Sequence, residues 1–360
     1  MSWAGEDHKR VAHHRSAPVS VEITTVADDL IVVHDGTDVE RLMGLVADTD
    51  YEVRGQAVRT LARPEGDLLC RIGTVNDVHF GEMEAGRLDE RAEGPILHVA
   101  PGDEPYPEMM NRSAVAEMLD AELDALVVKG DLSTDGTNDE FDLFDEVYGV
   151  FGDRLHVVRG NHDAYRGQER FAGDEWIELP GVAVALLDTT IPQQAHGTLT
   201  AAQLDWLDER AAAATVPVIV MGHHHQWLAP AAAHGIEVPI GGGDVYFGID
   251  PAASTALADV CERRTSIIAY TSGHSHRHRR REMPSGVPSI EVGCVKDFPG
   301  TWAEYRVFEG GVLQVVHRIS SPEALEWSER CRVLYSDFGL DYTEYALATL
   351  ADRCFPIALR

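Results

Sequence analysis

Lysine is rare in this chain, and basic residues are outnumbered by acidic ones. Three lysines occur among 360 residues, so arginine makes up nearly all of the 30 basic side chains, which stand against 60 acidic ones. The formal net charge of −30 argues against nonspecific binding to nucleic acid or to anionic membrane surfaces, because these would repel the protein. We therefore expect neither a nucleic-acid polymer nor a membrane among its partners.

Paired cysteines and long apolar runs are also absent. The five cysteines are odd in number and show no C-x-x-C spacing, which predicts buried reduced thiols. They are Cys70, Cys261, Cys294, Cys331 and Cys354. The first twenty residues are polar and lack the apolar core of a signal peptide, and no run approaches membrane-spanning length. These absences predict a cytoplasmic protein.

The remaining pattern divides the chain into four expected segments. Residues 1–18 are expected to be a flexible leader, and 19–66 a small β module because apolar and polar residues alternate there. Strand and helix patterns alternate over residues 67–320, which predicts an α/β domain. Residues 321–360 predict a helical tail, with its firmest part at Tyr342–Leu350. The β module has three open roles: completing the pocket, forming a dimer contact within a homo-oligomer, or covering an edge strand.

Helices are expected between the strands of the main domain. The segment Ser113–Leu126 is amphipathic, and Thr137–Glu140 and Thr200–Gln203 are capping boxes that predict helix starts. Two insertions, Gly81–Asn111 and Gln226–Arg264, are expected to form long loops. Long loops at the chemical end of a sheet often form the substrate pocket.

Five short apolar runs each stop at a cluster of potential metal ligands. The runs are Leu68–Val75, Ala125–Val128, Leu155–Val158, Val216–Met221 and Ile267–Tyr270. Directly after them come Asp77, His79, Asp131, Asn161, His162, His223, His274 and His276. Ligand sites of open α/β sheets lie at the carboxyl ends of strands, so we expect these side chains to meet. A mixture of imidazole and carboxylate ligands suits Zn, Fe, Mn or Co better than Ca, and a bridging carboxylate is what a two-metal site requires.

The order of these motifs resembles the calcineurin-like metallophosphoesterase superfamily over roughly residues 67–319. The matching motifs are Asp77-x-His79, Gly130-Asp131, Gly160-Asn161-His162-Asp163, Gly222-His223 and Gly273-His274-x-His276. The resemblance implies a four-layer α/β/β/α sandwich with two sheets between helices. It also implies two divalent metal ions, of which Mn, Fe and Zn are the candidates, and a small phosphoester as substrate.

The resemblance further implies a role for each motif residue. One metal would be held by Asp77, His79, Asp131 and His276. The other would be held by Asp131, Asn161, His223 and His274. Asp131 would then bridge the two metals, and His162 would stabilise the phosphate and protonate the leaving oxygen as a general acid.

Several residues keep alternative interpretations. His224 could replace His223 as the ligand, whereas His225 is expected to be structural or to line the pocket. Residues 277–281 form either a phosphate clamp or an edge strand whose arginines pair with surface acids. Asp163 is a candidate for orienting a neighbouring histidine.

The motif around Asp131 narrows the expected activity. Purple acid phosphatases carry a tyrosine where this chain has Thr134, and Ser/Thr protein phosphatases read Asp-Arg-Gly where this chain reads Thr134-Asp135-Gly136. Residues 130–136 look more like the bacterial class III cyclic-nucleotide and glycerophosphodiester phosphodiesterases. We therefore expect a phosphodiesterase acting on a small phosphodiester such as a 3′,5′-cyclic nucleotide. A phosphomonoesterase, a glycerophosphodiesterase and a non-catalytic scaffold of the same fold remain as alternatives.

Overall fold

Two six-stranded sheets form the centre of the protein in a computed structural model that describes residues 21–87, 94–227 and 247–360. The first sheet has the order β10 (Leu155–Val158), β9 (Ala125–Lys129), β6 (Leu68–Val75), β17 (Thr301–Phe308), β18 (Gly311–Arg318) and β19 (Phe355–Ala358). The second has the order β11 (Glu175–Leu179), β12 (Val182–Leu187), β13 (Val218–Gly222), β14 (Ile267–Ser272), β16 (Pro288–Glu291) and β15 (Arg279–Glu282). The expected leader at 1–18 lies outside the described residues.

The strands that precede the ligand motifs run parallel within their sheets. In the first sheet, β9 pairs in parallel with both β6 and β10. In the second, β13 pairs in parallel with β12 and β14. Parallel neighbours end at the same edge of a sheet, so the loops after these strands gather at one end of each sheet.

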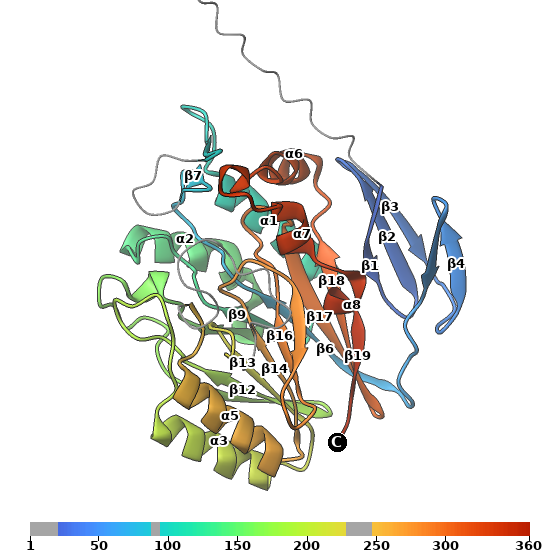
Figure 1. Ribbon diagram of the computed structural model, residues 1–360, viewed down its shortest axis with the longest axis vertical. Helices are drawn as coiled ribbons and strands as arrows, with labels where there is room; N and C mark the ends of the chain where they lie inside the picture. The colour runs from blue at the N-terminus through green and yellow to red at the C-terminus, as the bar shows by residue number, and fades with distance from the viewer. Residues whose placement is uncertain (1–20, 88–93, 228–246) are drawn as a thin grey trace, which may run out of the picture.

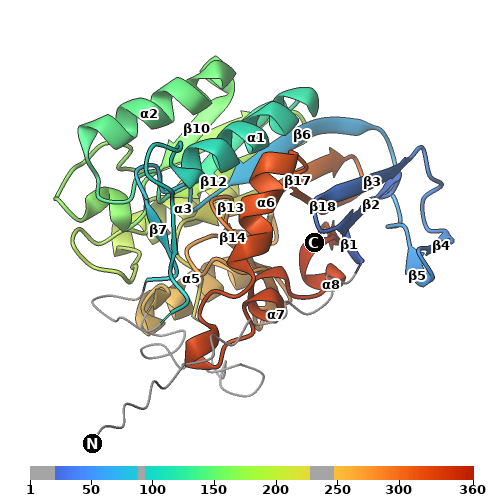
Figure 2. The same ribbon diagram turned by 90° about the horizontal axis from the view of Figure 1, so that it is seen from above.

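Helices cover the outer faces of both sheets, as Figures 1 and 2 show. The first sheet is covered by α1 (Tyr106–Asp120), α2 (Asn138–Tyr148) and α6 (Pro322–Cys331), whose apolar side chains share one core cluster with it. The second is covered by α3 (Ala201–Ala213) and α5 (Pro251–Arg263) in the same way. The four-layer α/β/β/α prediction is confirmed.

The core between the sheets is made of large apolar side chains. Ile72 and Tyr305 of the first sheet belong to the same cluster as Val184, Ile219 and Met221 of the second, and all five are fully buried. Burial of this apolar area is the main favourable contribution to the stability of such a sandwich. The two sheets are thereby fixed relative to each other, and with them the loops at their ends.

The small N-terminal β module is confirmed and packs beside β18. It consists of a three-stranded sheet and a hairpin: β1 (Glu22–Val26), β2 (Leu30–Asp35), β3 (Asp38–Met43), β4 (Asp50–Val53) and β5 (Gln56–Arg59). The Thr25 hydroxyl donates to the Val316 carbonyl at 2.7 Å. Arg306 Nη1 lies 2.7 Å from a carboxylate oxygen of both Asp28 and Asp29. The module therefore lies against β18, which is an inner strand between β17 and β19, so these contacts do not decide among the three open roles (Figure 1).

The expected helix at Ser113–Leu126 is misplaced. The helix begins earlier, at Tyr106, because Pro107 suits its first turn, and it ends at Asp120. Glu122 then takes a left-handed backbone with φ of 53°, which no α-helix contains. Leu123 is buried as a loop residue ahead of β9.

The tail and the insertions also differ in part from expectation. The longest tail helix is α6, whereas α7 (Tyr342–Leu347) and α8 (Leu350–Arg353) are short, because Ala348 has a φ of 49° between them. The tail ends in a strand, β19, that pairs with β18. The first insertion holds the short strands β7 (Glu84–Ala85) and β8 (Leu97–His98), and α5 lies within the second. Within the described part of the chain, no helix combines the length and apolarity needed to cross a membrane.

Both capping boxes are confirmed, and one of them gives a stability prediction. The Thr137 hydroxyl accepts from the Glu140 amide at 3.3 Å, while Glu140 Oε2 accepts from the Thr137 amide at 2.9 Å. Thr137→Ala should lower the free energy of unfolding by about 1 kcal/mol, because the start of α2 loses its cap. Urea denaturation measures the change, and Thr137→Ser, which keeps the hydroxyl, should retain most of the stability. An alanine variant as stable as the serine variant would contradict this role.

Candidate metal centre

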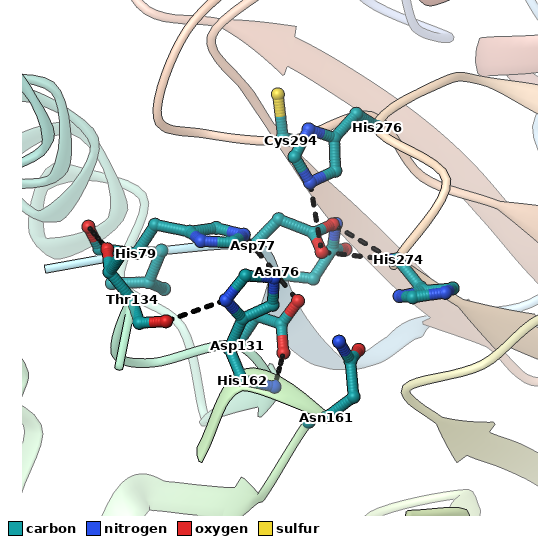
Figure 3. Close-up of polar contacts among 12 residues, drawn as sticks. Asn76, Asp77, His79, Asp131, Thr134, Asn161, His162, His274, His276 and Cys294 are labelled. Carbon is teal, nitrogen blue, oxygen red and sulfur yellow. Dashed lines mark hydrogen bonds and ion pairs between the residues drawn. The ribbon is translucent and has the colours of Figure 1, made fainter. Parts of the chain in front are cut away.

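Loops from both sheets bring all seven predicted ligand residues and His162 together. Three of these loops follow β6, β9 and β10 of the first sheet, and two follow β13 and β14 of the second. Figure 3 shows Asp77, His79, Asp131, His274 and His276 facing a common centre, with Asn161 alongside. Groups of potential ligand atoms lie within 4.8 Å of one another here, among them Asp77, His79 and His276.

Five of the seven residues have a left-handed backbone. The φ angles are 55° at Asp77, 51° at His79, 52° at Asp131, 67° at His274 and 52° at His276. Such a conformation costs on the order of 1–3 kcal/mol in a residue with a side chain, and it persists only where the surroundings hold it. These angles cluster at functional sites, so the backbone itself marks this position in the fold.

Asp131 occupies the middle of the group. Its Oδ2 atom lies 3.5 Å from His79 Nε2 and 3.3 Å from His223 Nε2. Its Oδ1 atom accepts a hydrogen bond from the His162 amide at 3.0 Å. The carboxylate is therefore close to His79, a candidate ligand of one metal ion, and to His223, a candidate ligand of the other. A residue that bridges two metal ions must be close to the ligands of both.

Asp77 ties the loop after β14 to the loop after β6. Its carboxylate accepts from the His274 amide at 3.1 and 3.0 Å, and His276 Nε2 lies 3.6 Å from Asp77 Oδ1. The side-chain amide of Asn76 donates to the same carboxylate. A ligand carboxylate that is itself hydrogen-bonded keeps its orientation.

Hydrogen bonds fix the orientation of His223 and Asn161. The Lys129 carbonyl lies 2.8 Å from His223 Nδ1, and because a carbonyl only accepts, Nδ1 carries the hydrogen. In the neutral ring the lone pair is then on Nε2, which lies 3.0 Å from Asn161 Oδ1. The Asn161 amide nitrogen donates to the Tyr165 hydroxyl at 2.6 Å, which turns the amide oxygen toward His223.

The three consecutive histidines have different surroundings. His224 Nδ1 lies 2.8 Å from the Thr189 hydroxyl, while its Nε2 has no hydrogen-bond partner and lies near His223 and His274. His223 alone among the three is within 3.3 Å of Asp131. His225 lines the cavity, as expected.

The buried nitrogens of this group fit divalent metal ions. Both ring nitrogens of His79 and Nε2 of His274 are buried without a hydrogen-bond partner. Leaving buried polar atoms unpaired is costly, and the donor set of imidazoles, carboxylates and one amide oxygen is one that Zn, Fe and Mn accept. His79, Asp131, His223 and His274 would be satisfied by ions placed among them.

The pKa values of His79, His274 and Asp131 favour cation binding, whereas that of His223 opposes it. Burial lowers the pKa of His79 and of His274 well below the ordinary histidine value, so both rings are neutral near pH 7. Burial opposes the charge on His223 too, but the Asp131 carboxylate raises the pKa of this ring to about 9. Burial opposes ionisation of Asp131, yet His223 and His162 hold its pKa well below the usual range. Asp131 is therefore ionised.

His162 lies beside the candidate ligands, and one of its ring nitrogens forms a hydrogen bond. Its Nδ1 lies 2.7 Å from the Thr134 carbonyl, so Nδ1 donates and Nε2 is left for another partner. The ring is 4.6 Å from that of His79 and 4.7 Å from that of Tyr165, measured between centroids. His162 also has a potential ligand atom within 4.8 Å of those of His79 and Asp131, so its position suits either a ligand or a residue that acts on substrate.

Asp163 fixes backbone rather than a histidine, contrary to expectation. Its carboxylate accepts from the amides of Gly160, Leu132 and Ser133 at 2.7, 3.2 and 2.9 Å. These amides belong to the loops after β9 and β10, and the short chain between Gly160 and Asp163 lets the carboxylate fold back on them. Burial, followed by the charge of Asp131, raises the pKa of Asp163 to about 6.

A cavity of about 310 Å³ opens next to the candidate ligands. Its walls include Tyr165, Ala195 and Phe247 on the side of the main domain. The C-terminal tail contributes Tyr335, Leu340, Tyr342 and Tyr345. A cavity of this volume lies at the lower end of the range for small-molecule sites.

The basic run after the last motif leads into the expected edge strand, but its arginines pair with a buried acid and not with surface acids. Strand β15 is the edge of the second sheet, and Arg277, Arg279 and Arg281 each form an ion pair with Glu291, at 2.9, 2.6 and 3.2 Å. Arg277 also lines the cavity. The run therefore has a structural role, with one of its members at the pocket wall.

Sequence reasoning missed several residues of the pocket. Lys296, Glu82 and the tail tyrosines line the cavity, and none of them belongs to a motif. The rarity of lysine in the sequence could have pointed to one of these residues. Lys129 and Lys296 are two of only three lysines, and both are almost fully buried close to the centre.

The family model described as calcineurin-like phosphoesterase matches residues 70–278. This chain belongs to the calcineurin-like phosphoesterase family. The matched segment contains every predicted ligand residue of the phosphoesterase, and the family is metal-dependent. The clusters of His and Asp described above are consistent with its binuclear metal site.

Relatives of this phosphoesterase are distant. A probable cyclic nucleotide phosphodiesterase from Synechococcus is 31% identical over 107 residues, 28% of this chain and 42% of that one. A cAMP/cGMP dual specificity phosphodiesterase from Mycobacterium tuberculosis is 26% identical over 42% of this chain and 48% of its own. A probable glycerophosphodiester phosphodiesterase from Arcobacter nitrofigilis is 26% identical over 43% and 57%. The chain thus spans about half the length of the curated relatives it matches.

The fold of the phosphoesterase has solved counterparts. A dimetal phosphatase from Danio rerio superposes with a TM-score of 0.51 at 16% identity, covering 69% of this chain and 96% of that one. At this identity the likeness shows the fold alone.

Metal binding should release a proton from His223. The pKa of this ring is about 9, so it is protonated near neutral pH, and a metal ion can bind only the deprotonated nitrogen. Mn²⁺ affinity should therefore fall as the pH is lowered below about 9. Calorimetric titration of the metal-free protein in two buffers with different ionisation enthalpies measures the proton release, and His223→Asn should release less. Identical heats in both buffers would contradict the prediction.

Proposed function

We propose that this phosphoesterase is a phosphodiesterase that hydrolyses a small phosphodiester, such as a 3′,5′-cyclic nucleotide, at a dinuclear metal centre. The observation that carries the proposal is the position of Asp131, whose Oδ2 atom lies 3.5 Å from His79 Nε2 and 3.3 Å from His223 Nε2. A single carboxylate between two groups of ligands is what two adjacent metal ions need.

We assign the ligands as the motifs predict. The first ion is assigned to Asp77, His79, Asp131 and His276. The second is assigned to Asp131, Asn161, His223 and His274. The contacts of His223 with Asp131 and Asn161 support this residue over His224, which contacts Thr189 instead.

Two bound divalent ions would supply Lewis acidity, which lowers the pKa of water and offsets the charge of the phosphate. The protein's own residues orient the ligand atoms and supply the proton for the leaving oxygen. Asn161 and Asp77 are held by hydrogen bonds, so their oxygens need no reorientation when substrate enters. His162, with Nδ1 anchored on Thr134, presents Nε2 to the leaving oxygen and protonates it as a general acid.

The charge balance of the pocket supports a diester over a monoester. Lys296 Nζ lies 2.6 Å from Glu82 Oε2 and 3.2 Å from Asp297 Oδ2, so two carboxylates face this buried lysine. These acids offset the positive charge that would otherwise attract a doubly charged phosphate. A monoester carries close to two negative charges at neutral pH and a diester only one, so the diester fits better.

The names of the relatives also support a phosphodiesterase. Cyclic nucleotide and glycerophosphodiester phosphodiesterases both cleave diesters, as their names say. The apolar and aromatic wall formed by Tyr165, Phe247 and Leu340 favours an organic group with a ring over glycerol. This wall is the reason for placing cyclic nucleotides ahead of glycerophosphodiesters.

The Mn²⁺-loaded protein should hydrolyse bis(p-nitrophenyl) phosphate faster than p-nitrophenyl phosphate. The diester carries less charge into a pocket whose buried lysine, Lys296, is paired with two acids, and release of p-nitrophenolate measures both rates. Activity on both should disappear in Asn161→Ala if one site is responsible. A preference for the monoester would move the assignment to a phosphomonoesterase, and the absence of activity on either would favour the scaffold alternative.

Replacement of His162 should separate catalysis from metal binding. His162→Ala should lower kcat by a factor on the order of 10²–10⁴, because the leaving oxygen loses its proton donor. Metal content measured by mass spectrometry should stay at the wild-type level, whereas Asp131→Ala should lose both metal and activity. Loss of metal from His162→Ala would show that this residue is a ligand and not the general acid.

A further inference from the structure

Helix α7 (Tyr342–Leu347) lies in the tail, beyond the residues that match the family. Two of its side chains, Tyr342 and Tyr345, nevertheless line the cavity. Figures 1 and 2 both show α7 close to α6 and α8. A segment outside the shared domain thus forms part of the site.

Two hydrogen bonds fasten α7 to the ligand loop, by which we mean residues 273–278. The Tyr345 hydroxyl donates to the Ser275 carbonyl at 2.8 Å. The His278 amide donates to the Ala346 carbonyl at 3.0 Å. Ser275 stands between the two candidate ligands of the loop, so the contact with Tyr345 reaches the backbone that positions both.

The ligand loop needs such support because its backbone is strained. His274 and His276 have φ angles of 67° and 52° on either side of Ser275. The Ser275 hydroxyl donates to Glu291 Oε2 at 2.7 Å, so the second sheet holds Ser275 by its side chain while α7 holds it by its carbonyl. Strained residues persist only where several contacts define their conformation.

A second tyrosine of α7 contacts the surroundings of His276. The Tyr342 hydroxyl donates to Asp297 Oδ1 at 3.0 Å, and Tyr342 is 1% exposed. Asp297 and Cys294 each have a potential ligand atom within 4.8 Å of one on His276. Helix α7 therefore contacts the centre at two separate points.

We propose that α7 is a positioning element of the metal centre and that Tyr345 controls metal affinity by holding the ligand loop. The inference rests on the proposed assignment of His274 and His276 as ligands. Without the Tyr345 hydroxyl, the Ser275 carbonyl loses its partner and the two strained residues lose one of the contacts that define them. The imidazoles would then be less well prepared to bind, which weakens affinity without removing a ligand.

Tyr345→Phe tests the proposal, because it removes the hydroxyl and keeps the ring. Mn²⁺ binding to the metal-free full-length protein, measured by calorimetric titration, should weaken by about tenfold, the lower end of the effect of residues that orient ligands. The metal concentration that half-activates hydrolysis should rise, and excess Mn²⁺ should restore turnover. Unchanged Mn²⁺ affinity would overturn the proposal.

Tyr335→Phe is the matched control. Tyr335 lies in the same tail and lines the same cavity, and its hydroxyl makes no hydrogen bond to the ligand loop within the described parts of the chain. Its Mn²⁺ affinity should equal that of the wild type. Equal weakening in Tyr335→Phe and Tyr345→Phe would show that loss of any tail hydroxyl has this effect, and would overturn the role of Tyr345.

Ser275→Ala is a second test variant, which changes the contact of the ligand loop with the second sheet and not the contact with α7. It removes the contact with Glu291 and should also weaken Mn²⁺ binding, because it takes away another contact that defines the strained loop. If Tyr345→Phe does not fold, as judged by thermal unfolding of the metal-free protein, unchanged Mn²⁺ affinity in Ser275→Ala would overturn the proposal, since the loop would then need no such contacts. The readout is independent of the proposed activity. A wild type that binds Mn²⁺ but cleaves no phosphoester would refute the phosphodiesterase, while the comparison of affinities would still test α7.

Discussion

The left-handed backbone at five residues of the metal centre is the constraint on which the site depends. Asp131 can hold this conformation because its neighbours are small. A side chain on Gly130 would meet His223 Nδ1 at 2.5 Å, and one on Gly160 would collide with Asp131 itself. The loops after β9, β10 and β13 therefore approach one another at the distance of backbone atoms. This close approach, held by Asp163, places ligand atoms from two different sheets within reach of the same ions.

Much of this arrangement could be predicted from the sequence, because it is encoded locally. Each motif directly follows an apolar run, so the rule that sites lie at the carboxyl ends of strands was enough to gather Asp77, Asp131 and His223. The two capping boxes likewise act within four residues. Contacts between distant segments could not be predicted. No pattern in the sequence around Tyr345 indicates that its hydroxyl donates to the Ser275 carbonyl, because this contact depends on the tertiary fold. The same holds for β19, whose four residues form a strand only because β18 offers them an edge.

The distribution of charge links the composition to the site. In a chain with a net charge of −30, the two lysines that the structure describes, Lys129 and Lys296, are both buried. Lys129 donates to the Thr271 hydroxyl and the Ser272 carbonyl at 3.1 and 3.0 Å, and burial lowers its pKa to about 7. Lys296 is paired with Glu82, and this pair neutralises part of the pocket wall. The charge of Lys296 is thus balanced by nearby acids, whereas Arg277, Arg279 and Arg281 share the single carboxylate of Glu291.

The position of strand β17 in the first sheet determines how long a fragment of this chain must be to fold alone. This strand lies between β6 and β18, so the strand that carries Asp77 at its end is completed by residues past 300. A chain cut at residue 278, where the family match ends, would leave one side of β6 with unpaired amides and carbonyls. Such an open edge invites pairing with other chains, and aggregation is its usual result. The autonomous domain of this protein therefore extends well beyond the segment that identifies its family.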